Sequence, residues 1–263
     1  MEHAATESTS VRLVTEVPGP LSRAVVARHE AALPQCMSLH LPIMVDHASG
    51  ALLTDIDGNT FIDWAGGVGC LNAGHVNERV RDAIIAQTER FTHTDYTVLP
   101  YETYVRLAER MNERAPMSGP CKTAFFNTGA EAVENAIKIA KASTGRSGVI
   151  CFDGAFHGRS LMAMSLTSKT HPYKAGFGPF APEVYRAPFP NALEFNGDAE
   201  AAGAAAIARL RAMFDTHVAA ETVAAIIVEP VQGEGGFLVP PASFLQGLRD
   251  IADEYCMVLI FDE

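Results

Sequence analysis

The order of elements in this chain is decided by residues 122–152, which read KTAFFNTGAEAVENAIKIAKASTGRSGVICF. Short apolar runs at 123–126 and 148–152 predict two buried strands. Between them, residues 130–142 place their apolar side chains on one face of a helix. Two strands joined by a helix of this length indicate a parallel sheet whose faces are covered by helices.

The same alternation continues towards the C-terminus. Helical patterns occur at 199–214 and 243–254, and buried strands are predicted at 223–228 and 257–261. The first of these helices is rich in alanine and is interpreted as a surface helix. We therefore expect an α/β fold with a mostly parallel sheet and helices on both faces.

Residues 1–75 have a different character. Strand-like runs at 51–53 and 60–64 flank Asp-Ile-Asp-Gly-Asn at 55–59, which is a hairpin signal. We predict two domains, an N-terminal segment with a small α+β part at 1–75 and a large domain at 76–263. Because the chain stops directly after a predicted strand, the large domain is expected to be truncated at its C-terminal end. Two more helical patterns follow residue 75, at 80–85 and 104–111.

The composition excludes several classes of protein. A hydrophobic fraction of 48% with 19% charged residues is typical of a globular chain. The net charge of -11 repels phosphate backbones and anionic headgroups, so neither nucleic acid nor a membrane is expected as a partner. No apolar run approaches the roughly 20 residues that span a bilayer, and no signal-peptide core is present, so we expect a cytoplasmic protein. The five cysteines form no C-x-x-C pair, and no metal site is predicted.

A phosphate-binding motif is indicated where the strand at 123–126 gives way to a helix. Thr128 and Glu131 have the spacing of a capping box. Gly129 between them leaves free N–H groups at the positive end of the helix dipole, which favours a phosphate. A capped helix that binds nothing is the alternative.

Three further motifs follow predicted strands. The residues Phe156, His157 and Arg159 offer a ring to stack on, an imidazole and a guanidinium that binds a carboxylate. Each motif alone also suits a polar loop, a tight turn or a helix cap. Together they describe a site for a phosphorylated cofactor with a charged ring nitrogen, because an acidic group at a strand end holds such a nitrogen protonated. The acidic residues in these motifs are Glu229, Glu234 and Asp262.

These motifs make the chain resemble the class III pyridoxal-phosphate-dependent aminotransferases. The resemblance covers residues 34–263 and implies the fold-type I architecture of that family, together with pyridoxal 5'-phosphate as cofactor. The sequences that carry it are FIDWAGGV at 61–68, LNAGH at 71–75, NTGAEAVEN at 127–135, GAFHGR at 154–159, YKAGFG at 173–178 and EPVQGEGG at 229–236.

The resemblance also implies a role for each matching residue. Gly129 and Ala130 would bind the cofactor phosphate through backbone N–H groups, Phe156 would stack on the ring, and Asp262 would pair with the ring nitrogen. Arg159 would take the substrate carboxylate. The implied cofactor-binding set is Thr128, Gly129, Ala130, Phe156, His157 and Asp262. The implied substrate-binding set is Val68, Thr97, Arg159, Glu229 and Glu234, with Glu229 supporting Arg159 and Glu234 masking a second, downstream arginine.

The chain departs from the family pattern at several positions. Ala130 stands where a serine is frequent, Phe156 where a tyrosine is frequent, and Thr97 where some members have a glutamine. The Schiff-base lysine of the family lies downstream of the Asp262 motif, so it is expected beyond Glu263. No catalytic residue is therefore assigned within the chain, and the fragment by itself is expected to be inactive. Its five lysines match no such position: Lys122, Lys138, Lys141, Lys169 and Lys174.

The activity implied for the complete protein is transfer of the amino group of 4-aminobutyrate to 2-oxoglutarate, giving succinate semialdehyde and glutamate. Another ω-amino donor stays open as an alternative, such as ornithine, acetylornithine, 5-aminovalerate or a β-amino acid. A non-catalytic protein that binds a partner or the free cofactor is the alternative from another class. The family resemblance also implies a homodimer when the protein is complete.

Overall fold

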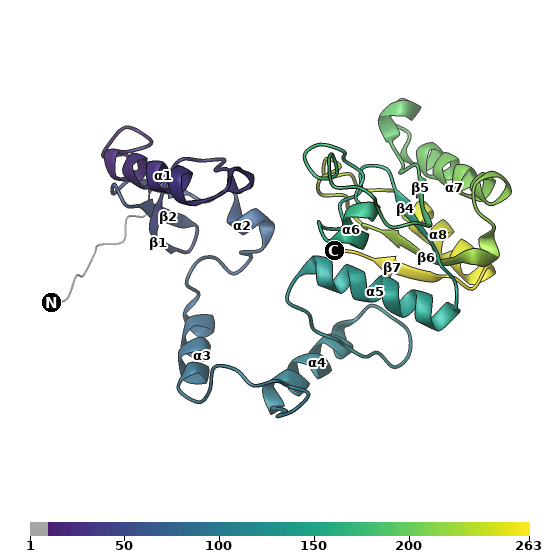
Figure 1. Cartoon of the computed structure of the whole chain (residues 1–263), viewed down its shortest axis with the longest axis horizontal. Coiled ribbons are helices and arrows are strands. Elements are labelled where there is room, and N and C mark those ends of the chain that lie inside the picture. The colour runs from purple at the N-terminus through teal and green to yellow at the C-terminus, as the bar shows by residue number, and fades with distance from the viewer. Residues whose placement is uncertain (1–9) are drawn as a thin grey trace. The chain divides into compact units, whose positions relative to one another are not determined.

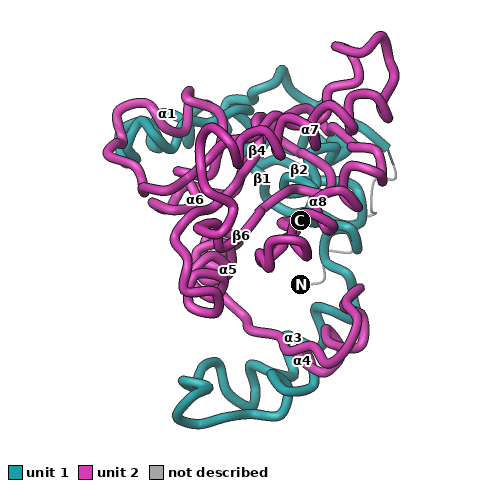
Figure 2. The backbone as a smooth tube through the Cα atoms, turned by 90° about the vertical axis from the view of Figure 1, so that its right-hand side faces the viewer, with its two compact units in different colours: residues 1–106 teal, residues 107–263 magenta. Residues whose placement is uncertain are grey.

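The computed structural model describes residues 10–263 (Figure 1). The chain divides into two compact units between Arg106 and Leu107 (Figure 2). Each unit is described by itself below, and the sequence-based domain division at residue 75 stays a prediction. Among the described residues, no helix is both long and apolar enough to cross a membrane.

The first unit contains a three-stranded antiparallel sheet in the order β1-β2-β3. β2 (Leu52–Asp55) and β3 (Thr60–Ile62) form the predicted hairpin, which is confirmed. The turn between them is stable because Oδ1 of Asp55 accepts hydrogen bonds from the backbone N–H groups of Asp57 and Asn59, at 2.9 and 2.8 Å. The third strand is β1 (Val45–Ser49).

Helices flank this sheet in the sequence. α1 (Pro20–Ala32) begins with a proline, and its free N–H groups at Leu21 and Ser22 donate to the carboxylate of Asp57 at 2.7 and 2.8 Å. The hairpin turn therefore caps this helix. The remaining helical elements up to the boundary between the units are η1 (Gln35–Met37), α2 (Gly66–Gly69), α3 (Glu78–Thr88) and α4 (Glu102–Arg114). The two helices predicted from spacing, α3 and α4, are confirmed.

The second unit contains a parallel four-stranded sheet in the order β5-β4-β6-β7 (Figure 1). Its strands are β4 (Gly148–Phe152), β5 (Val184–Ala187), β6 (Val223–Val228) and β7 (Val258–Phe261). Its helices are α5 (Gly129–Thr144), α6 (Leu161–Leu166), α7 (Ala199–Thr216) and α8 (Ala242–Glu254), with short 3-10 turns η2 (Ala192–Phe195) and η3 (Ala220–Thr222). The predicted α/β fold is confirmed.

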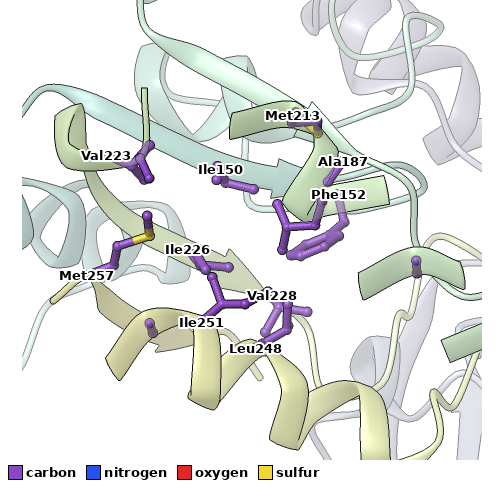
Figure 3. Packing of buried hydrophobic residues seen from close by; sticks show 14 of the residues in the cluster. Ile150, Phe152, Ala187, Met213, Val223, Ile226, Val228, Leu248, Ile251 and Met257 are labelled. Carbon is purple, nitrogen blue, oxygen red and sulfur yellow. The ribbon is translucent and has the colours of Figure 1, made fainter. Parts of the chain in front are cut away.

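Both faces of this sheet are buried, because successive side chains of a strand point to opposite sides. Ile150 and Phe152 of β4 lie in the cluster that α7 and α8 cover (Figure 3). Val149 and Cys151 of the same strand lie in the cluster on the other face, with residues of α5 and α6. The alanine-rich α7 was expected at the surface, but one of its sides is buried as part of the core.

One expected strand is absent from the described sheet. Residues 123–126 were predicted to be a strand, and this prediction is wrong, because they lie in no ladder. A strand requires a neighbour that accepts and donates its backbone hydrogen bonds. Neither of the two edge strands, β5 and β7, pairs with residues 123–126. The hydroxyl of Thr123 instead donates to Oδ1 of Asn112 at 2.7 Å.

A single arginine joins the amino ends of two strands. Arg146 directly precedes β4, and its Nη1 donates to the backbone carbonyls of Val223 at 3.1 Å and Tyr255 at 2.8 Å. Val223 opens β6, and Tyr255 lies shortly before β7. This end of the sheet is therefore fixed by a contact to the backbone.

Candidate active site

The N-terminus of α5 has the predicted capping box. Oγ1 of Thr128 accepts from the N–H of Glu131 at 3.1 Å, and Oε2 of Glu131 accepts from the N–H of Asn127 at 2.7 Å. Beside Gly129 there is open space, because a Cβ built there meets no atom within 4 Å. The first turn of the helix is thus fixed in place and open to an anion.

The loop after β4 packs against this helix start through Gly158. Its φ is 122°, and an added Cβ would lie 2.9 Å from the Cβ of Ala130 and 3.0 Å from that of Ala163. Only glycine fits at this position, since any side chain would clash and strain the backbone. The contact brings the loop that carries Phe156 and Arg159 next to the start of α5.

His157 is buried within this loop and contacts the end of another strand. Its Nδ1 lies 2.7 Å from Oδ2 of Asp262, which directly follows β7. The sequence analysis placed His157 beside the cofactor ring, whereas its nearest polar partner in the structure is this carboxylate. Among the described residues, Oδ1 of Asp262 has no hydrogen-bond partner, so one carboxylate oxygen stays available.

Phe156 and Arg159 surround the ring of Tyr173. The centroids of the Phe156 and Tyr173 rings are 5.0 Å apart, and the Cζ of Arg159 lies 5.8 Å from the Tyr173 centroid. Arg159 is exposed and forms no ion pair with any residue of the described chain. A guanidinium in this state is ready to bind a carboxylate.

Two side chains connect the loop after β4 with the loop after β6. Glu229 accepts from the N–H of Phe156 at 3.0 Å and from that of Gly233 at 3.3 Å. The buried Gln232 donates from Nε2 to the carbonyl of Asp153 at 2.8 Å. Glu229 was expected to support Arg159, but its partners in the structure are these backbone groups. Burial raises the pKa of Glu229, although the two N–H groups favour its charged form.

Glu234 lies on the loop after β6 and has a basic partner. Its Oε2 is 3.1 Å from the Nζ of Lys169. The hydrogen bond from Lys169 is the largest cause of a lowered pKa for Glu234, and the hydroxyl of Tyr173 adds to the effect. No group of three or more His, Cys, Asp or Glu side chains in the described part of the chain is placed to hold a metal ion.

Three supporting residues were missed by the sequence analysis. Oγ1 of Thr167 accepts from the N–H of His157 at 3.0 Å and donates to the carbonyl of Gly158 at 3.0 Å. Arg186 donates to the carbonyls of Phe152, Ser165 and Thr167, and Glu134 accepts from Ser160 and the N–H groups at the start of α6. Such contacts join residues far apart in the sequence, so no local pattern indicates them.

Val68 and Thr97 belong to the first unit, so their part in the site stays a prediction. Val68 is fully exposed and has a positive φ of 61° within α2. The side chain of Thr97 is exposed and donates to Oδ1 of Asp95 at 2.6 Å. Neither residue is compared here with the residues of the second unit.

Comparison with known proteins decides the family. The model of the class-III aminotransferases matches residues 35–263. This chain belongs to the class III aminotransferase family. As a class III aminotransferase, it is 46% identical over 257 residues to 4-aminobutyrate aminotransferase of Mycobacterium tuberculosis, which covers 97% of this chain and 57% of the relative. The chain therefore spans somewhat more than half the length of this relative.

Two other class III relatives have different printed substrates. The 5-aminovalerate aminotransferase of Pseudomonas aeruginosa is 42% identical, over 92% of this chain and 56% of its own. The crystal structure of taurine:2-oxoglutarate aminotransferase from Bifidobacterium kashiwanohense, in complex with pyridoxal phosphate and glutamate, superposes with a TM-score of 0.84 at 25% identity, over 95% of this chain and 56% of that one. Class III aminotransferases depend on pyridoxal phosphate.

The residues of the second unit fit this cofactor. The open helix start at Gly129 suits a phosphate, and the half-buried ring of Phe156 offers a stacking surface. The available oxygen of Asp262 suits a protonated ring nitrogen. The five lysines include Lys169, which is paired with Glu234, and Lys174, which donates to the carbonyl of Thr167 at 3.1 Å. The position of the cofactor-bearing lysine beyond Glu263 stays a prediction.

Proposed function

We propose that the complete protein carrying this chain transfers the amino group of 4-aminobutyrate to 2-oxoglutarate, giving succinate semialdehyde and glutamate. The observation that carries the proposal is the meeting of three groups at the carboxyl ends of the parallel strands. They are the capped start of α5 at Thr128, the unpaired guanidinium of Arg159 and the carboxylate of Asp262. The 46% identity to a 4-aminobutyrate aminotransferase supports the choice of substrate.

In this proposal, the chain binds the cofactor through its own loop and helix termini. Thr128, Gly129 and Ala130 hold the phosphate, and Phe156 covers the ring. Asp262, which His157 holds through its Nδ1, keeps a proton on the ring nitrogen. The cofactor, when bound, supplies an electron sink for the carbon that bears the amino group.

Arg159 sets the class of amino donor in the proposal. Its guanidinium binds the carboxylate of a substrate whose amine is several carbons away, as in 4-aminobutyrate. Val68 and Thr97 are proposed to line the substrate pocket, and Glu229 holds the loop that carries Phe156. The family resemblance also leads us to propose a homodimer that acts in the cytoplasm.

A donor comparison tests this function. The full-length protein, loaded with pyridoxal phosphate, is assayed for glutamate formation from 2-oxoglutarate with 4-aminobutyrate, 5-aminovalerate, ornithine, acetylornithine and β-alanine. We expect the highest kcat/KM with 4-aminobutyrate, and a large loss for Arg159→Met through a raised KM of the donor. A clear preference for ornithine would contradict the proposal.

5-Aminovalerate is the second candidate donor. The observation that favours it is the 42% identity to a 5-aminovalerate aminotransferase. It differs from 4-aminobutyrate by one methylene, and one methylene is worth only about 1–3 kcal/mol of discrimination in a pocket. The ratio of the two kcat/KM values decides between them. A protein that binds the cofactor but transfers no amino group from any donor would instead support the non-catalytic alternative.

A further inference from the structure

The pair formed by Lys169 and Glu234 lies beside the proposed carboxylate-binding arginine. Lys169 Nζ is 3.1 Å from Glu234 Oε2, and both side chains are partly exposed, at 47% and 43%. Tyr173 interacts with the same carboxylate and also lies under the guanidinium of Arg159. Two cations and one anion thus share the surface around the ring of Tyr173.

Glu234 is the mobile member of this group in a loop that is otherwise held. Gln232 and Leu238 exchange two backbone hydrogen bonds of 3.0 Å, and Glu229 accepts from the N–H of Gly233. The side chain of Glu234 therefore reaches another partner by changing its rotamer, without movement of the loop. Its charge is compensated by Lys169 as long as it stays in the observed position.

We propose that Lys169 is a positioning residue that holds Glu234 aside, and thereby sets the preference of the site between dicarboxylate and monocarboxylate substrates. This inference rests on the proposed function, in which Glu234 covers a second arginine while a monocarboxylate is bound. A dicarboxylate such as 2-oxoglutarate needs that arginine uncovered. The contact with Lys169 stabilises the position in which Glu234 leaves it free, and Tyr173 supports the same position.

The size of the effect follows from the exposure of the pair. Exposed ion pairs contribute about 0.2–1 kcal/mol, and 1.36 kcal/mol corresponds to a factor of ten. Loss of the Lys169 charge therefore shifts the two positions of Glu234 by a factor of about 1.5–5. Substrates that need the arginine uncovered lose affinity by that factor, because the population that binds them falls.

The test compares Lys169→Met, which removes the charge and keeps the length of the side chain, with Lys169→Arg, which keeps the charge. Lys138→Met is the matched control, since Lys138 is exposed on α5 and contacts only Asn135 in the described chain. In the full-length, cofactor-loaded protein, we expect Lys169→Met to lower kcat/KM for 2-oxoglutarate about 1.5- to 5-fold with no loss for 4-aminobutyrate. Lys169→Arg is expected to restore the ratio.

A second background separates positioning from a general structural role. In Glu234→Gln protein the charge that Lys169 holds is gone, so Lys169→Met is expected to leave the ratio unchanged there. Equal losses for both substrates, no change of the ratio, or the same change in the Glu234→Gln background would each overturn the inference.

Binding of unreactive acids gives a readout that does not depend on turnover. Calorimetry with glutarate, a dicarboxylate, and butyrate, a monocarboxylate, is expected to show weaker glutarate binding and unchanged butyrate binding in Lys169→Met. Failure of the wild-type protein to transfer the amino group of 4-aminobutyrate would overturn the proposed function. An unchanged ratio of glutarate to butyrate affinity would overturn the role of Lys169, whatever the donor.

Discussion

His157 and Asp262 are 105 residues apart in the sequence, yet Nδ1 of the imidazole lies 2.7 Å from Oδ2 of the carboxylate. The imidazole is fully buried, and Asp262 is partly exposed at the end of β7. Donation to the carboxylate requires the proton to be on Nδ1. One oxygen of Asp262 is thereby fixed from behind, and the other stays free to face a ligand.

Removal of this imidazole is expected to weaken cofactor binding. In His157→Ala the carboxylate of Asp262 loses a hydrogen bond of the kind worth about 1.5–3 kcal/mol, which corresponds to about tenfold or more in affinity. Absorbance titration of the full-length protein with pyridoxal phosphate measures the dissociation constant. His217→Ala, at an exposed site on the end of α7, serves as the control and should bind normally. Equal affinities for both variants would contradict the assignment.

The hydroxyl of Thr167 is expected to stabilise the loop that carries His157. Thr167→Val keeps the shape of the side chain but leaves the N–H of His157 buried without its acceptor, at 3.0 Å in the wild type. An unsatisfied buried donor costs about 1–3 kcal/mol. Urea unfolding should show this loss for valine and a smaller one for Thr167→Ser, which retains the hydroxyl. A valine variant as stable as wild type would show that the hydrogen bond contributes nothing.

Glu229 is expected to make stability depend on pH in a specified direction. Burial raises its pKa in the folded protein, so the folded state holds this proton more tightly than the unfolded state. The contribution of Glu229 to stability is therefore largest below the unfolded value of 4.5 and falls as the pH rises through the raised pKa. Glu229→Gln removes this dependence. Its stability relative to wild type should rise between acidic and neutral pH.

The measurement for Glu229 is urea unfolding at several pH values. Glu221→Gln is the control, because Glu221 is exposed in η3 and its removal should leave the pH dependence of wild type in place. A Glu229→Gln variant whose stability follows the wild-type pH profile would show that burial of this carboxylate does not influence folding.

The core beneath the sheet is expected to respond to the loss of one aromatic ring. Phe244 of α8 is fully buried, with its ring centroid 5.6 Å from those of both Phe152 and Phe189. Phe244→Ala should lower the free energy of unfolding by about 3–5 kcal/mol. Phe237, which is 83% exposed, offers a matched control whose alanine variant should change it by less than about 0.5 kcal/mol. Similar losses in the two variants would contradict the described core.

Elements with strong periodicity were predictable from the sequence. The helix α5 and the strands β4, β6 and β7 lie within a residue or two of the predicted ranges, because their apolar spacing is fixed by burial. The capping box of Thr128 was also predictable, since both of its hydrogen bonds are local. Residues 123–126 have the same apolar character, but a strand depends on a neighbour that the local sequence does not reveal.

The partners within the site were less accessible to sequence reasoning. Glu229 was expected near Arg159, yet it binds the N–H of Phe156, because its position depends on how two loops meet. The contact of Thr167 with His157 depends on the return of the chain after α6, a helix for which no signal was recognised. Residue types indicated the chemistry, and the three-dimensional arrangement assigned the partners.

Arg146 separates the framework of the sheet from its chemistry. It holds the amino ends of β6 and β7 through backbone carbonyls, which are present whatever side chains the neighbours carry. The loops at the opposite ends of the strands are thus free to diverge without loosening the framework. Relatives whose printed substrates are 4-aminobutyrate, 5-aminovalerate and taurine are what such a division of labour would produce in evolution.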